Sequence, residues 1–75
     1  MARKRFTAQE KLDFTPDTPI QWRNGSHWHP GTVRGEIATD SDGWARVWIE
    51  NHATTRTVSK GDCHFSYPGS IRLPQ

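Results

Sequence analysis

Residues 32–50 have the sequence TVRGEIATDSDGWARVWIE, and this stretch decides the fold class. Residues 32–39 alternate, with Val33, Gly35 and Ile37 on one side, and after a central Asp-Ser-Asp-Gly the aliphatic residues Ala45, Val47 and Ile49 occupy every second position. A period of two is typical of extended strands. Asp and Gly at 40–43 suit the backbone angles of a tight hairpin turn. The sequence therefore predicts two antiparallel strands, over residues 32–39 and 44–50, joined by this turn.

Before and after this stretch, the chain has three further short segments with a strand pattern, each next to a turn signal of Gly, Asn, Asp or Pro. The predicted strands cover residues 20–23, 56–60 and 70–73. Five short strands close together in one small chain favour an all-β barrel, because closure removes exposed sheet edges.

The N-terminal segment has a different pattern. Thr7-Ala8-Gln9-Glu10 fits a capping box, in which a hydroxyl and a carboxylate three residues later satisfy each other's backbone N–H groups. Pro16 limits the helix to one or two turns. We therefore expect residues 1–17 to form a basic N-terminal arm with a short helix, and residues 18–75 to form the small β-barrel.

The order of these elements resembles a known shape. Trp28-x-Pro30-Gly31-x-Val33-x-Gly35, followed by the hairpin and turn spacing described above, looks like the Src-homology-3-like small barrel that Tudor and chromo-barrel domains share. The resemblance covers residues 18–74 and is one of architecture, with no specific family assigned. It implies a five-stranded Src-homology-3-like barrel with a short N-terminal arm or helix. The peptide-binding signature of true Src-homology-3 domains is absent, so no proline-rich ligand is implied.

Composition narrows the class further. The chain has 75 residues, of which 32% are hydrophobic, so one small core without a deep cleft is expected. No apolar run is long enough to span a membrane, and no export signal follows the basic start. The single cysteine, Cys63, cannot form a disulfide within the chain, which favours a reducing compartment. We expect a soluble, cytoplasmic protein.

The net charge of +2 lies in the N-terminal segment. Residues 1–14 contain four basic and two acidic residues, whereas residues 15–75 contain six of each. A phosphate-binding surface normally needs several uncompensated cations, so the balanced barrel favours protein over nucleic acid as a partner.

The candidate binding face follows from the phase of residues 44–50. If the three aliphatic residues Ala45, Val47 and Ile49 point inward, the alternate residues point outward together with polar residues of the preceding strand. Tryptophan and arginine are the residues most enriched in binding hot spots. The predicted partner-binding residues are Trp44, Arg46, Trp48, Arg34 and Glu36.

An alternative for this face stays open at this stage. The N-terminal segment could fold over it through Phe6, Leu12 and Phe14 and bury both tryptophans. The other two tryptophans are expected to be structural: Trp22 to fill the core, and Trp28 to cap one end of the barrel.

The sequence thus predicts a non-catalytic binding module whose Trp/Arg sheet face docks another protein or a second copy of the chain. The alternative is a nucleic-acid-binding barrel. In that case Arg3, Lys4 and Arg5 would contact phosphates, while Trp48 and Arg46 would stack on unpaired bases.

No catalytic residue, cofactor, metal site or small-molecule substrate is predicted, and no membrane partner. His27, His29, Cys63 and His64 are metal-ligand residue types, but the second Cys or the His pair of common zinc sites is missing. Cys63 and His64 are adjacent in sequence, which is not the spatial pairing that activates a thiolate. The chain is therefore not expected to be an enzyme.

Overall fold

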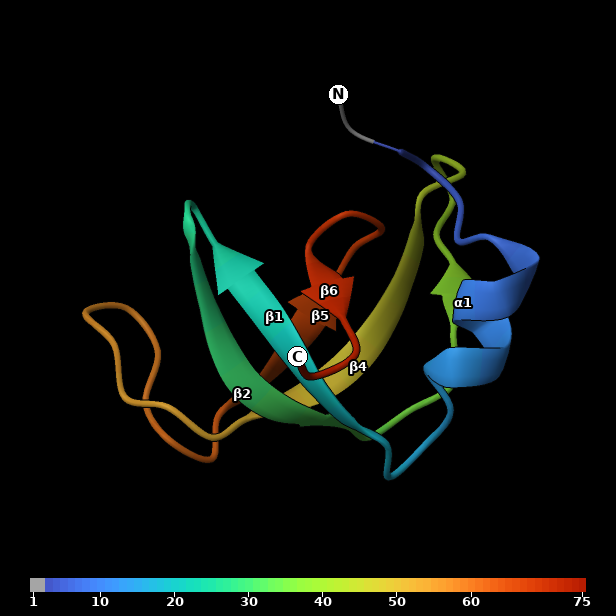
Figure 1. The fold of residues 1–75 in the computed structure, drawn as a ribbon. Helices are drawn as coiled ribbons and strands as arrows, with labels where there is room; N and C mark the ends of the chain where they lie inside the picture. Colours follow the sequence, from blue (N-terminus) through green and yellow to red (C-terminus); the bar gives the residue numbers. More distant parts are fainter. Residues whose placement is uncertain (1–2) are drawn as a thin grey trace.

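One short helix precedes a curled β-sheet (Figure 1). The computed structural model describes residues 3–75, so the first two residues of the predicted arm lie outside the described residues. The elements in chain order are α1 (Ala8–Asp13), β1 (Pro19–Asn24), β2 (His27–Val33), β3 (Ala38–Thr39), β4 (Ala45–Asn51), β5 (Cys63–Ser66) and β6 (Ile71–Arg72). Within residues 3–75, no helix has the length and apolar character needed to cross a membrane.

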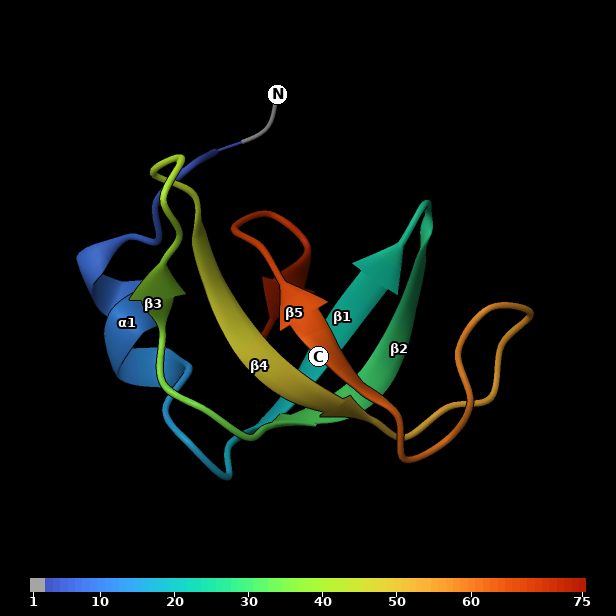
Figure 2. The ribbon, with the colours of Figure 1, turned by 180° about the vertical axis from the view of Figure 1, so that it is seen from behind.

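All strand pairs are antiparallel. The sheet order is β3-β4-β2-β1-β6, and β5 also pairs with β4. Figures 1 and 2 show the sheet curling into an open barrel, with β1 and β2 forming one wall and β4 and β5 the other. The expectation of an all-β small barrel is confirmed.

The predicted strand phase is also confirmed. Ala45, Val47 and Ile49 are all buried. Trp22 fills the core as expected, with 3% of its surface exposed. The remaining core residues are Phe6, Phe14, Ile20, Val33 and Ile71.

The curl of the sheet brings β2 very close to β4 at Gly31. A β-carbon on Gly31 would lie 2.8 Å from the backbone oxygen of Glu50 and 3.1 Å from a ring carbon of Trp22. Side-chain-bearing residues cannot be accommodated at such a separation without a shift of the backbone, so glycine is needed at this crossing.

The short helix forms as the capping box predicts. Thr7 Oγ1 accepts a hydrogen bond from the backbone N–H of Glu10, and the Glu10 carboxylate accepts one from the backbone N–H of Thr7. Phe6 and Phe14 lie at the two ends of α1 with their ring centres 5.9 Å apart. Because both rings are buried, they hold this otherwise marginal helix against the barrel.

The predicted hairpin turn at 40–43 is confirmed. Asp40 Oδ1 accepts hydrogen bonds from the backbone N–H groups of Asp42 and Trp44, each at 2.9 Å. Gly43 has a φ of 85°, a left-handed conformation that glycine adopts at no steric cost. The turn brings β3 back against β4.

The predicted strand over residues 32–39 is interrupted in its middle. Pairing ends at Val33 and resumes at Ala38. Gly35 lies against Trp48, since a β-carbon on Gly35 would be 3.1 Å from the Trp48 β-carbon. The strict alternation expected here, with Gly35 on the same face as Val33, is therefore wrong.

The predicted strand over residues 56–60 does not form. The Thr55 hydroxyl accepts a hydrogen bond from the backbone N–H of Val58, and Asp62 Oδ2 accepts one from the backbone N–H of Ser59. Such local bonds offer the backbone an alternative to a sheet ladder. Residues 63–66 instead form β5, which pairs with β4 and was not predicted from the sequence.

A buried asparagine fixes the loop that follows β4. Asn51 Oδ1 accepts hydrogen bonds from Trp22 Nε1 at 3.1 Å and from the Ala53 backbone N–H at 2.9 Å. Asn51 Nδ2 donates to the Ser59 carbonyl at 3.0 Å and also to the Ala53 carbonyl. The side chain thus links the core of the barrel to both ends of the 53–59 segment.

Candidate interaction face on β4 and β5

The outward positions of β4 carry the residues that the sequence placed there. Trp48 is 38% exposed and Arg46 is half-buried. Both alternate with the buried Ala45, Val47 and Ile49, so the strand presents one apolar face and one mixed face. The phase on which the candidate face depends therefore places Trp48 and Arg46 outside the barrel.

A third residue, Phe65 of β5, completes this part of the face. Phe65 is the register partner of Trp48, and their ring centres lie 4.7 Å apart at 68° in an edge-to-face contact. The Arg46 guanidinium carbon lies over the Phe65 ring, 4.0 Å from its centre. Phe65 is 39% exposed. We call Arg46, Trp48 and Phe65 the Trp48 cluster.

Sequence reasoning missed Phe65 because it predicted no strand over 63–66. The only available signal was the spacing of two between the aromatic residues Phe65 and Tyr67, which is weak evidence for a strand. Without β5, no register could place Phe65 beside Trp48.

Arg34 lies next to the cluster but is occupied by two carboxylates. Its Nε donates to Glu50 Oε1 at 3.1 Å and its Nη1 donates to Asp17 Oδ1 at 2.9 Å. Hydrogen bonding to Glu50 raises the pKa of Arg34 above its ordinary value. Its backbone N–H donates to the Trp48 carbonyl at 2.8 Å, so Arg34 flanks the cluster as a neutralised polar border.

Trp44 and Glu36 do not join the Trp48 cluster. Lys4 Nζ lies 5.3 Å from the centre of the Trp44 ring, and the Ala45 backbone N–H donates to the Lys4 carbonyl at 2.7 Å. Trp44 is therefore half-buried beside the N-terminal arm. Glu36 is exposed and lines an open groove of about 420 Å³ between α1 and β3.

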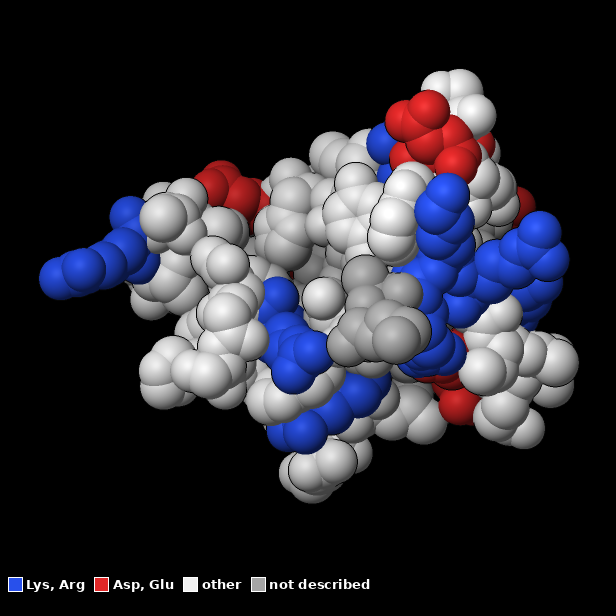
Figure 3. Space-filling view, turned by 90° about the horizontal axis from the view of Figure 1, so that it is seen from above, with Lys and Arg blue, Asp and Glu red and all other residues white. Residues whose placement is uncertain are grey.

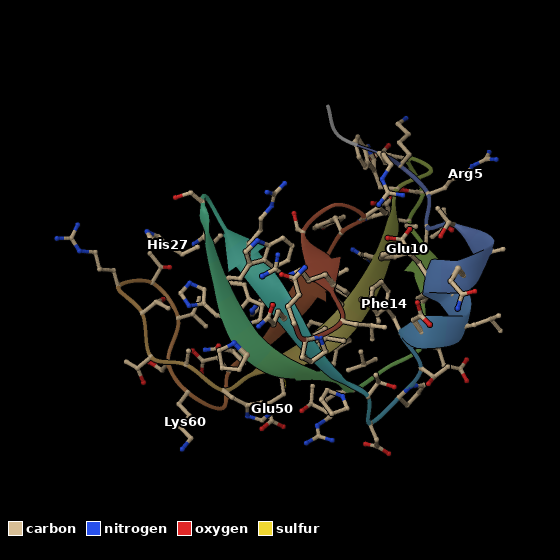
Figure 4. All side chains as sticks on the ribbon, in the orientation of Figure 1. Arg5, Glu10, Phe14, His27, Glu50 and Lys60 are labelled. Carbon is tan, nitrogen blue, oxygen red and sulfur yellow. The ribbon has the colours of Figure 1, made fainter. Side chains whose placement is uncertain are left out.

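The N-terminal segment does not bury Trp48. Phe6 and Phe14 are in the core, at 4% and 3% exposure, and Leu12 is 72% exposed. Figure 4 shows Phe14 at the end of α1 nearest the sheet and Arg5 pointing away from the body. The alternative that Phe6, Leu12 and Phe14 together cover both outward tryptophans is therefore wrong for Trp48.

The basic arm is partly neutralised by its own surroundings. Arg3 makes two hydrogen bonds to the Glu10 carboxylate, each at 3.0 Å, which lower the pKa of Glu10. Lys4 lies over Trp44, and Arg5 is exposed. Figure 3 shows Lys and Arg in separate groups across the face seen from above, with Asp and Glu beside several of them.

Two of the four histidines, His29 and His64, lie against the Trp22 ring. His29 and His64 have ring centres 4.9 Å and 4.6 Å from that of Trp22. Among residues 3–75, no group of three His, Cys, Asp or Glu side chains is placed to share a metal ion. Cys63 is exposed and free.

Comparison with known proteins found no match among protein-family models, curated proteins or solved structures. Inference about function therefore starts from the geometry of this chain.

Proposed function

We propose that this chain is a non-catalytic binding module that docks a protein partner on the Trp48 cluster. The observation that carries the proposal is the pair of contacting rings, Trp48 and Phe65, left nearly two-fifths exposed with Arg46 over the Phe65 ring. Aromatic residues with an adjacent arginine form the centres of most interface hot spots. The rigid edge-to-face contact also limits the side-chain entropy lost on binding.

Charge supports a protein partner on this face. Arg34 is paired with Asp17 and Glu50, whereas Arg46 makes no ion pair within residues 3–75 and is available to a ligand. In such an interface, the two rings would contact apolar side chains of the partner. The Arg46 guanidinium would donate hydrogen bonds to one carboxylate or carbonyl of the partner. A second copy of this chain is one such protein.

The alternative role, nucleic-acid binding by the arm with Trp48 and Arg46 as stacking residues, has less support. Arg3 is held by Glu10, and Lys4 Nζ donates a hydrogen bond to the Asp42 carbonyl at 3.4 Å. Only Arg5 of the three predicted phosphate contacts is free of a described partner, and one cation releases few counterions.

The free cysteine leads us to propose a reducing, cytoplasmic setting. No small-molecule substrate or cofactor is part of the proposal.

Affinity capture from the native host tests this function. Wild type should retain a protein partner after nuclease treatment, and Trp48→Ala should lose it. Leu12→Ala is the matched control, because Leu12 is an exposed apolar residue on α1, away from the cluster. Capture that disappears with nuclease would support the nucleic-acid alternative, and equal capture by wild type and Trp48→Ala would refute the proposed face.

A further inference from the structure

A second aromatic and arginine cluster lies on the other wall of the barrel. The Arg72 guanidinium carbon lies over the Trp28 ring, 4.0 Å from its centre, and that of Arg23 lies 5.3 Å from the same centre. Trp28 and Arg23 are register partners across β1 and β2. We call these three residues the Trp28 cluster. Trp28 is not followed by a turn at Pro30 and Gly31, because β2 continues through both residues.

The pairing of strands explains how the two arginines meet. In β1, residues 21 and 23 point to the same side, and Gln21 is the register partner of Arg72. Gln21 Oε1 accepts a hydrogen bond from Arg72 Nε at 2.7 Å. This bond fixes the guanidinium over Trp28 and leaves its terminal nitrogens unoccupied among the described contacts.

Among residues 3–75, no carboxylate forms an ion pair with this cluster. The strands β1, β2 and β6 contain no Asp or Glu. Within residues 3–75, every Lys or Arg ion pair to a carboxylate involves Arg3 or Arg34, so neither Arg23 nor Arg72 has one. Two like charges on one ring repel each other, and a bound anion would relieve that repulsion.

We propose that the Trp28 cluster binds single-stranded nucleic acid, with Arg23 and Arg72 contacting phosphates and a base stacking on the Arg72–Trp28 pair. The Arg72 guanidinium, centred 4.0 Å from the middle of the indole, adds a second planar group to the ring, and unpaired bases stack on both kinds of group in proteins. An acidic peptide would satisfy the two charges but would make no use of this plane. The nucleotides of a single strand, which carry both phosphates and unpaired bases, therefore fit the cluster better than carboxylates do.

This site is separate from the protein-docking face. Figures 1 and 2 show β1 and β2 on one wall of the barrel and β4 and β5 on the other. The two proposals can therefore fail independently. Together they describe a module that joins a protein to single-stranded nucleic acid.

Fluorescence anisotropy with a short labelled oligothymidine tests the proposal. We expect binding at low salt with a log–log salt slope of about −1.4, since each phosphate contact on a single strand contributes about −0.7. The double variant Arg23→Gln/Arg72→Gln should bind at least about tenfold more weakly and lose this slope. Arg72→Lys should keep the slope but bind more weakly, because lysine retains the charge and loses the plane.

The matched control removes the same charge elsewhere. Lys4→Gln/Arg5→Gln takes two positive charges from the arm and should change oligothymidine binding by less than about threefold, the general effect of net charge. An equal loss in both double variants would overturn the proposal. So would the absence of binding by wild type, or tighter binding of a polyglutamate peptide than of oligothymidine.

The four tryptophans supply an independent readout. Their indole N–H signals can be followed by NMR, with Trp28 assigned from a Trp28→Phe variant. Oligothymidine should shift the Trp28 signal and leave that of Trp48 in place. A shift of Trp48 or Trp44 with Trp28 unmoved would refute the site, and well-dispersed amide signals in each variant would verify that it is folded.

Discussion

The guanidinium carbon of Arg46 lies 4.0 Å from the centre of the Phe65 ring. Arg23 and Arg72 rest on Trp28 in the same way, and none of these three arginines has a carboxylate partner within residues 3–75. Each such contact stabilises by roughly 0.5–1 kcal/mol at an exposed site. Contact with a ring therefore helps to hold three cations in place, and Arg72 uses its Nε for Gln21 while its terminal nitrogens are left for a partner.

Trp48→Ala should weaken binding of the protein partner by more than about 1 kcal/mol without unfolding the barrel, because Trp48 is exposed and outside the core. Phe65→Ala should do the same, and the double variant should lose less than the sum, since the two rings touch. Calorimetry with the captured partner measures all three affinities. Thermal unfolding is the companion measurement, and a collapse of the Trp48→Ala melting temperature would mean that Trp48 is a core residue.

Gly31→Ala should destabilise the fold by about 1–3 kcal/mol, because the new β-carbon would meet the Glu50 carbonyl at 2.8 Å. In Gly35→Ala the new β-carbon would lie 3.1 Å from the Trp48 β-carbon, and a small movement of either residue can relieve this contact. We expect it to cost less stability but to displace Trp48 and weaken partner binding. Urea denaturation ranks the two, and a Gly35→Ala loss equal to that of Gly31→Ala would contradict this account.

Much of the fold could be predicted from local sequence. The alternation of Ala45, Val47 and Ile49 with polar residues defined the buried face of β4, and the Thr7–Glu10 capping box defined the start of α1. These features depend on residues a few positions apart, where strand and helix periods act directly.

The candidate site was only half predictable, because its geometry comes from long-range pairing. Phe65 meets Trp48 only through the β4–β5 register, and Arg72 meets Trp28 only through β6 joining β1. The strand wrongly predicted over residues 56–60 also shows that local sequence does not determine which segments pair. Its β-branched residues suit a strand, but the Thr55 and Asp62 side chains satisfy its backbone locally.

Asn51→Ala should lower the free energy of unfolding by about 1–3 kcal/mol, since it removes the donor to the loop carbonyls and leaves the Trp22 Nε1–H with only the Pro30 carbonyl, at 3.3 Å, among the described residues. The loss should be smaller in a Trp22→Phe background, where that donor is already absent. Limited proteolysis should also cut the 53–59 segment faster. Unchanged proteolysis together with unchanged stability would show that the Asn51 bonds do not anchor this loop.

Acid should loosen α1 through Glu10. Hydrogen bonds from Arg3 lower the pKa of Glu10, and the Thr7 backbone N–H lowers it further. A carboxyl whose pKa is lower in the folded than in the unfolded state stabilises the fold above its unfolded pKa of about 4.3. That stabilisation is lost as the pH falls through the lower, folded-state pKa. Because the pair is at the surface, the effect should be below about 1 kcal/mol.

Glu10→Gln isolates this contribution, because glutamine keeps the capping hydrogen bond and loses the charge that Arg3 binds. Wild type should be the more stable protein at pH 7, by about 0.5 kcal/mol, and the difference should shrink as the pH falls below the unfolded-state pKa of about 4.3. Asp13→Asn is the matched control, since Asp13 is an acidic residue of the same helix that accepts from Gln9 and has no ion pair among the described residues. Chemical denaturation at pH 7 and pH 3 measures the difference, and a gap between wild type and Glu10→Gln that persists undiminished at pH 3 would exclude the charge of Glu10 as its cause.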